Sequence, residues 1–243
     1  FAKDAVASVD PSLTTITIFA TRLASSVTNP IVAASLSAGI TMQSSLNIFE
    51  DNDTGFIDKY MELFDPGSYL SNMRFQIGKK WVGSDANVYF IADLAANHDG
   101  DLSRAKGLIE KAKEAGADAA KFQNFKAPNI VSRSGFENLG MKLSHQSSWK
   151  KSVYEVYEGA SIAPDWTPLL REHCDKGGIE YMTSPYDRES VDLVDPYVRA
   201  FKICSGDITF TELLLHIASK KKPILLATGA STLAEVTEAV KTF

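Results

Sequence analysis

The feature that most constrains the fold of this chain is a predicted strand followed by a helix, repeated with short connections. The predicted strands start near Val88, Asp118, Ile179, Val198 and Pro223, and each is followed by a segment with helical spacing of apolar residues. Such alternation is typical of a parallel sheet whose strands are joined by helical crossovers. The sequence therefore predicts an α/β protein.

The repeat fits two architectures, an open doubly wound sheet and a (β/α)8 barrel. No G-x-G-x-x-G sequence follows a predicted strand, which weakens the dinucleotide-binding form of the open sheet. Polar residues stand at the carboxyl end of every predicted strand, and in a barrel these ends meet at the mouth where active sites lie. We therefore expect a (β/α)8 TIM barrel, truncated after about five βα units, over residues 71–243, with residues 1–70 unassigned.

Composition narrows the class of protein. The 25 Lys and Arg against 30 Asp and Glu give a net charge of −5, which argues against nucleic acid as a partner. The apolar N-terminal region is interrupted by polar residues and by Pro30, which argues against a membrane span. Two cysteines, Cys174 and Cys204, are too few for a disulfide framework and favour a cytoplasmic location.

Outside the repeat, two local patterns are informative. Residues 74–83 read as a β-hairpin that turns at Gly78, and residues 147–159 as a helix within the long connection between Gln123 and Ala163. The chain starts at Phe1 and stops at Phe243 inside an amphipathic helix, so we expect it to be a fragment of a longer protein.

Two lysines close apolar strands, Lys121 in DAAKFQ and Lys202 in RAFKICSGD. A buried lysine is costly unless an anion or a carboxylate meets its ammonium group. A single lysine of this kind is best interpreted as paired with a structural carboxylate or as reaching solvent. Two lysines at equivalent strand ends favour a functional role. We therefore predict that they bind a small anionic substrate.

Carboxylates and hydroxyls accompany these lysines. Asp93 ends the first strand and Asp207 follows the fourth, where each can act as a base, orient a sugar hydroxyl or neutralise a lysine. Structural and catalytic roles are about equally well supported for the two carboxylates. Hydroxyls that can hold phosphate oxygens stand at Ser184, Ser205 and Thr228.

The histidines do not indicate a metal site. His98 in AANHDGD is interpreted as a loop histidine that packs against its own turn, and no ligand spacing relates His145, His173 and His216. Cys204 is expected to be a buried small residue, since no histidine partner is evident.

Four ordered segments between about Arg74 and Phe243 carry a family resemblance. They read FIADLAANHDGDLSRAKGLIEKAKEAGADAAKFQNFKA, GIEYMTSPYDRESVDLV, AFKICSGDIT and KPILLATGASTLAEV. Together they resemble the sialic acid synthase family, the phosphoenolpyruvate-dependent synthases of N-acetylneuraminate and related nonulosonates. The resemblance does not extend to residues 1 to about 70.

The resemblance implies condensation of phosphoenolpyruvate with an N-acylated mannosamine-type sugar, with release of phosphate and with Mn²⁺ or Mg²⁺ as cofactor. It also implies a homodimer in which a small antifreeze-like domain completes the partner's active site. That domain and the metal-binding histidines are expected after Phe243, so the chain alone is expected to be inactive. The implied substrate-binding residues are Lys121, Gln123, Ser184, Lys202, Ser205 and Thr228, and the implied catalytic residues are Asp93 and Asp207.

Three positions depart from the family pattern. Asp93 in DLAANH and Asp207 in SGD stand where the family has glutamate, and Ala227 in ATGA replaces a serine expected to touch phosphate. Each aspartate keeps the charge and shortens the reach by one methylene. The sequence alone therefore leaves two alternatives open: a Schiff-base aldolase that uses Lys121 or Lys202 as nucleophile, and a sugar-phosphate-binding relative without catalysis.

Overall fold

The computed structural model describes residues 17–21, 31–33, 74–83, 86–139, 149–229 and 231–243. It forms two compact units, one of residues 1–19 and 90–197 and the other of residues 20–89 and 198–243, and each is described by itself. Most of the unassigned N-terminal segment, and also His145, lie outside the described residues.

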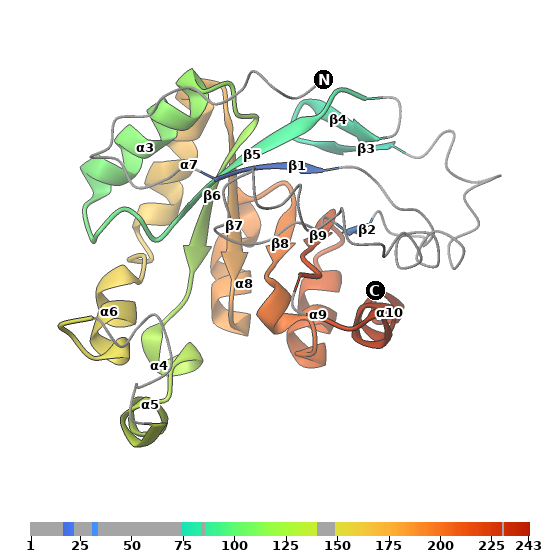
Figure 1. The fold of residues 1–243 in the computed structure, drawn as a ribbon. Coiled ribbons are helices and arrows are strands. Elements are labelled where there is room, and N and C mark those ends of the chain that lie inside the picture. The colour runs from blue at the N-terminus through green and yellow to red at the C-terminus, as the bar shows by residue number, and fades with distance from the viewer. Residues whose placement is uncertain (1–16, 22–30, 34–73, 84–85, 140–148, 230) are drawn as a thin grey trace, which may run out of the picture. The chain divides into compact units, whose positions relative to one another are not determined.

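The first unit is built on a sheet of order β1-β5-β6-β7 (Figure 1). Its strands are β1 (Thr17–Thr21), β5 (Tyr89–Ala95), β6 (Ala119–Asn124) and β7 (Glu180–Pro185). Strands β5, β6 and β7 are parallel, with Asp93 opposite Lys121 and Gln123 opposite Ser184. This register sets polar residues of neighbouring strands side by side.

Helices connect these strands. They are α3 (Leu102–Glu114), α4 (Ala127–Ile130), α5 (Arg133–Leu139), α6 (Val153–Ala160), α7 (Trp166–Gly177) and α8 (Arg188–Val194), followed by the 3-10 turn η3 (Asp195–Tyr197). The Asp101 carboxylate caps α3 by accepting from the backbone N–H of Ser103, and α7 ends at Gly178, whose φ is 71°. Helices α3 and α7 pack side by side (Figure 1).

The second unit contains a hairpin and a parallel sheet. The hairpin joins β3 (Arg74–Ile77) to β4 (Lys80–Gly83) through Gly78, whose φ is 61°. The parallel sheet has the order β2-β9-β8, from β2 (Ile31–Ala33), β9 (Ile224–Leu226) and β8 (Phe201–Ile203). The 3-10 turn η4 (Ser205–Asp207) and the helices α9 (Thr211–Ala218) and α10 (Leu233–Lys241) complete the unit.

The strands predicted to start near Val88, Asp118, Ile179, Val198 and Pro223 are all present, so the α/β class is confirmed. The hairpin and the helix within the long connection are also confirmed, the latter as α6. Helices α4 and α5 were not predicted, because they are too short to show a helical period. The described strands lie in separate sheets without closing a barrel, so an eight-stranded closure stays a prediction. No helix in the described residues is long and apolar enough to span a membrane.

Two neighbouring leucines on α7 test how this helix packs against the rest of the first unit. Leu170 is fully buried, whereas Leu169 is 38% exposed. Leu170→Ala leaves a cavity and is expected to lower the free energy of unfolding by about 2–5 kcal/mol. Leu169→Ala is expected to cost about 1 kcal/mol or less, because its side chain is already partly in water. Urea denaturation of both variants checks this, and equal losses would contradict the packing of α7.

Candidate functional site

A buried ion pair joins the first two parallel strands of the first unit. Lys121 on β6 is only 2% exposed, and its Nζ lies 2.7 Å from Oδ1 of Asp93 on β5. The Asp93 side chain is 22% exposed, and the contact is an ion pair without a well-aligned hydrogen bond. A buried ammonium group is tolerated only when a countercharge meets it. Asp93 supplies that countercharge and keeps one edge toward solvent.

Side chains alternate along a strand, so β6 and β7 each present two different faces. Lys121 and Gln123 share one face of β6, and Ser184 on β7 lies opposite Gln123 on the same face. Because Asp93 meets Lys121, it belongs there too. We refer to Asp93, Lys121, Gln123 and Ser184 as the polar face. Four of the residues predicted from sequence are thereby brought together within one unit.

Ser184, like Asp93, belongs to the polar face and has a buried oxygen without a hydrogen-bond partner. Its side chain is 1% exposed, and its Oγ makes no hydrogen bond to a protein group. A buried hydroxyl without a partner is unfavourable by about 1–3 kcal/mol on mutational scales. A hydroxyl donor and an ammonium group on one face are the groups that bind a carboxylate or a phosphate. The polar face is therefore suited to an anion.

The opposite face of the same strands carries a network that sequence reasoning missed. The Thr183 hydroxyl donates to Asn124 Oδ1 at 2.7 Å, and Asn124 Nδ2 donates to Thr167 Oγ1 of α7 at 3.3 Å. The Tyr181 hydroxyl also reaches Asn124 Oδ1, at 3.4 Å, and burial raises the pKa of that phenol. The available signal was the polar Asn124 and Thr183 within apolar strands. The network ties β6 and β7 to α7.

The remaining predicted residues lie in the second unit. Lys202 is half-buried on β8, Ser205 and Asp207 form η4 just beyond it, and Thr228 follows β9. Burial raises the pKa of the Asp207 carboxyl, and the charge of Lys202 offsets part of that rise. All four thus stand at carboxyl ends of parallel strands, as predicted. The substrate and catalytic roles of both groups of residues stay predictions.

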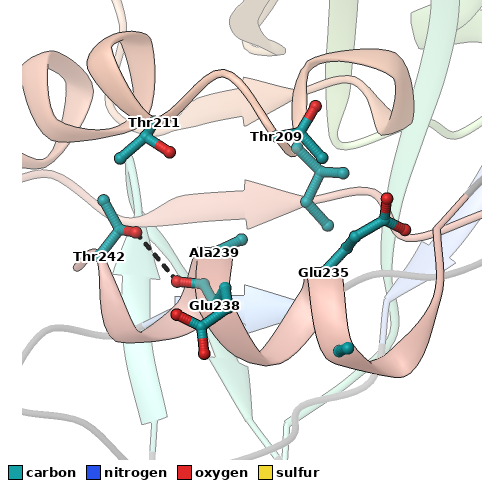
Figure 2. A pocket seen from close by; sticks show the side chains of 8 residues that line it. Thr209, Thr211, Glu235, Glu238, Ala239 and Thr242 are labelled. Carbon is teal, nitrogen blue, oxygen red and sulfur yellow. Dashed lines mark hydrogen bonds between the residues drawn. The ribbon is translucent and has the colours of Figure 1, made fainter.

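A pocket in the second unit does not have the character of an anion site. It lies between α10 and the chain that enters α9 (Figure 2), and its lining includes Thr209, Thr211, Glu235 and Glu238. Glu235 caps α10 by accepting from Thr232, and Glu238 pairs with Lys241 at 2.7 Å. Carboxylates at a pocket wall repel anions, so this pocket is not suited to an anionic ligand.

His98 packs against its own turn, as the sequence predicted. It is fully buried, its Nδ1 accepts the Gly100 N–H at 3.1 Å, and its ring meets Trp166 edge-on, with centroids 5.4 Å apart. The turn holds Ala95 at φ 48° and Asp99 at φ 50°. A non-glycine residue in this left-handed region costs about 1–3 kcal/mol, so surrounding contacts must hold it there.

The described residues do not assemble a metal site. No group of three or more His, Cys, Asp or Glu side chains in this part of the chain is placed to hold an ion. Cys204, expected to be buried, is only half-buried, because β8 ends at Ile203 and Cys204 begins the turn into η4. Cys174 is buried, and burial raises the pKa of its thiol to about 12.

Part of the chain matches a protein-family model and several known proteins. The model of the NeuB family matches residues 108–243. An N,N'-diacetyllegionaminic acid synthase of Legionella pneumophila is 39% identical over 166 residues, which cover 68% of this chain and 46% of that protein. A pseudaminic acid synthase of Campylobacter jejuni is 35% identical over 161 residues, covering 65% and 45%. The chain thus spans a little under half the length of these relatives.

A solved structure shows the same arrangement. The N-acetylneuraminic acid synthetase of Leptospira borgpetersenii, crystallised with citrate, superposes with a TM-score of 0.59 at 26% identity. The match covers 70% of this chain and 55% of that one. The fold of the chain is therefore that of a group of known synthases.

The unpartnered hydroxyl of Ser184 gives a direct test of the polar face. Ser184→Ala removes no protein hydrogen bond, so the free energy of unfolding is expected to stay within about 0.5 kcal/mol or to rise. Thr183→Val, one residue earlier, takes the 2.7 Å hydrogen bond from Asn124 and is expected to cost about 1–3 kcal/mol. Chemical denaturation of both variants measures this. A larger loss in Ser184→Ala would mean that its hydroxyl has a structural partner.

Proposed function

This chain belongs to the NeuB family, and on that premise we propose that it provides the phosphoenolpyruvate-binding part of a nonulosonate synthase. The reaction condenses phosphoenolpyruvate with an N-acylated mannosamine-type sugar and releases phosphate. Relatives named for legionaminic, pseudaminic and N-acetylneuraminic acids support this product class. All three are nonulosonic acids.

The observation that carries the proposal is the polar face. It combines a buried ammonium group, a buried hydroxyl without a protein partner and a carboxylate that is partly open to solvent. Phosphoenolpyruvate bears a carboxylate and a phosphate, which are the groups that such donors recognise. Lys121 and Ser184 are assigned to one of these two anionic groups. Gln123, between them on the same face, adds an amide that can orient the ligand.

The proposed chemistry needs little from the protein beyond positioning and charge. The double bond of the enol supplies the electron pair with which C3 attacks the aldehyde carbon of the open-chain sugar, and the aldehyde oxygen takes a proton. Water then adds to the cationic C2 and loses a proton. The resulting tetrahedral centre expels phosphate with the electrons of its C–O bond, while the C2 hydroxyl loses its proton and becomes the carbonyl group of the product. Holding the reactants in place lowers the barrier of the first step.

The carboxylates Asp93 and Asp207 are assigned to proton transfer and positioning. Burial raises the pKa of Asp207, which brings a carboxyl group closer to the range in which it exchanges protons near neutral pH. Asp93 lacks a methylene of the family glutamate, yet it contacts Lys121 at 2.7 Å. The shorter side chains therefore keep the charge arrangement that the proposal requires.

Phosphoenolpyruvate binding to Lys121 can be tested with a matched lysine. Lys121→Gln removes the buried ammonium group and is expected to weaken binding by about 10- to 150-fold, the equivalent of a charge-assisted hydrogen bond. Lys126→Gln removes an exposed lysine that pairs with Glu189 and should leave the affinity unchanged. Isothermal titration calorimetry measures both, with circular dichroism to confirm folding. Equal affinities would overturn the assignment.

Borohydride separates this proposal from a Schiff-base aldolase. Lys121 Nζ is engaged by Asp93, and an amine held against a carboxylate is a poor nucleophile toward a carbonyl group. We expect reduction with borohydride, in the presence of pyruvate and of the sugar, to leave Lys121 and Lys202 unmodified by mass spectrometry. A trapped adduct on either lysine would favour the aldolase.

A further inference from the structure

The turn that follows Asp93 holds a buried titratable group to which the proposed chemistry gives no role. Strand β5 leaves its regular register between Asp93 and Ala95, and the chain then turns through left-handed Ala95, Asp99 and Gly100 before α3 begins. His98 is at the centre of this turn and is fully buried. Whatever holds the turn also sets the position of Asp93, which lies two residues before Ala95.

The hydrogen bonds of the turn define the state of the His98 ring. The Gly100 N–H donates to Nδ1, so Nδ1 carries no proton and a neutral ring must be protonated at Nε2. The Nε2 atom is buried and makes no well-aligned hydrogen bond to a protein group, the Ala160 carbonyl contributes to the electrostatics of the ring, and the ring packs edge-on against Trp166. A second proton on Nδ1 would point at the Gly100 N–H and break this bond. The turn therefore requires neutral histidine.

We propose that His98 is a positioning residue: its neutral imidazole holds the turn between Ala95 and Gly100 closed, and through that turn it fixes where Asp93 meets Lys121. The inference rests on the proposed function only where ligand binding is the readout. Protonation of His98 opens the turn, lets Ala95 and Asp99 relax, and loosens the ion pair on the polar face.

The charged groups around the ring are Asp99 in the turn and Arg104 on α3. Arg104 Nε lies 3.2 Å from Asp99 Oδ2 and donates to the Asn97 carbonyl at 2.8 Å, so it holds the other side of the turn. Burial lowers the pKa of His98, and Asp99 and the Ala160 carbonyl oppose part of that effect. The net direction favours the neutral ring that the turn requires.

The sign of the pH effect follows from this lowered pKa. The folded protein holds His98 neutral below the unfolded value of about 6.5, so the unfolded chain binds the extra proton first. The contribution of the turn is thus fully present above about pH 6.5 and is lost as the pH falls through the folded pKa. Phosphoenolpyruvate affinity should fall with it, by up to about tenfold per pH unit below the folded pKa.

The test combines a spectroscopic readout with a matched pair of variants. Long-range ¹H–¹⁵N spectra of the wild-type chain should show His98 protonated at Nε2 alone at neutral pH, with a titration midpoint below about 6.5. His98→Asn keeps an acceptor near the position of Nδ1 but cannot titrate. His173→Asn makes the same change on α7, where His173 is partly exposed beside Glu110. Calorimetry follows phosphoenolpyruvate affinity of all three proteins from about pH 5 to 8.

We expect the wild type and His173→Asn to lose affinity together on acidification, and His98→Asn to lose distinctly less. The ionisation of phosphoenolpyruvate itself affects its binding to all three proteins equally. The ratio of the variant's affinity to that of the wild type, followed across the pH range, therefore tests the inference. A proton on Nδ1 of His98 at neutral pH, or an unchanged pH profile in His98→Asn, would overturn the inference.

If the wild type binds no phosphoenolpyruvate at any pH, the proposed function fails, but the positioning role of His98 can still be tested. The ¹³C shift of the Asp93 carboxyl carbon, followed across the same pH range in wild type and His98→Asn, reports directly on the ion pair. A shift that tracks His98 titration in the wild type and is absent in His98→Asn supports the positioning role. Identical curves exclude it.

Discussion

The burial of one positive charge governs the first unit. Lys121 is placed in the middle of β6, with Ala120 and Phe122 buried on either side, where an ammonium group is tolerated only against a nearby anion. Asp93 satisfies it from the neighbouring strand, which requires β5 and β6 to pair in one register. The unpartnered Ser184 hydroxyl lies on the same face of the sheet as this ion pair. The register of β5, β6 and β7 therefore brings the members of the polar face together.

The two faces of β6 carry different sets of contacts. On one face the Asn124, Thr183 and Thr167 network locks β6 and β7 against α7 through buried hydrogen bonds. On the other face Lys121, Gln123 and Ser184 lie together as members of the polar face. Buried hydrogen-bond networks of this kind favour one arrangement of the elements that they join. The network on the helix side is therefore expected to stabilise the strands that carry the polar face.

Much of this could be predicted from the sequence, for identifiable reasons. The strand positions follow from apolar runs, and the placement of Lys121, Ser184, Lys202 and Asp207 follows from the rule that parallel strands end on one side. The pairing of Lys121 with Asp93 could not be chosen over a solvent-exposed lysine, because it depends on register. The role of Asn124 was missed, because its hydrogen bonds lie on the face of β6 opposite to the polar face and depend on how α7 packs there. The exposure of Cys204 was misjudged because β8 is only three residues long.

The alternation of faces along β6 also bears on how this region tolerates change. A point substitution on either face disturbs one set of contacts, but inserting or deleting a single residue in the strand exchanges the faces. Lys121 would then point into the α7 layer and Asn124 away from it, so the buried network and the polar face would be lost together. Changes of length are therefore expected to be tolerated better in the connections between these strands than within them. Transplanting this site into another scaffold would require β5, β6 and β7 as one uninterrupted block.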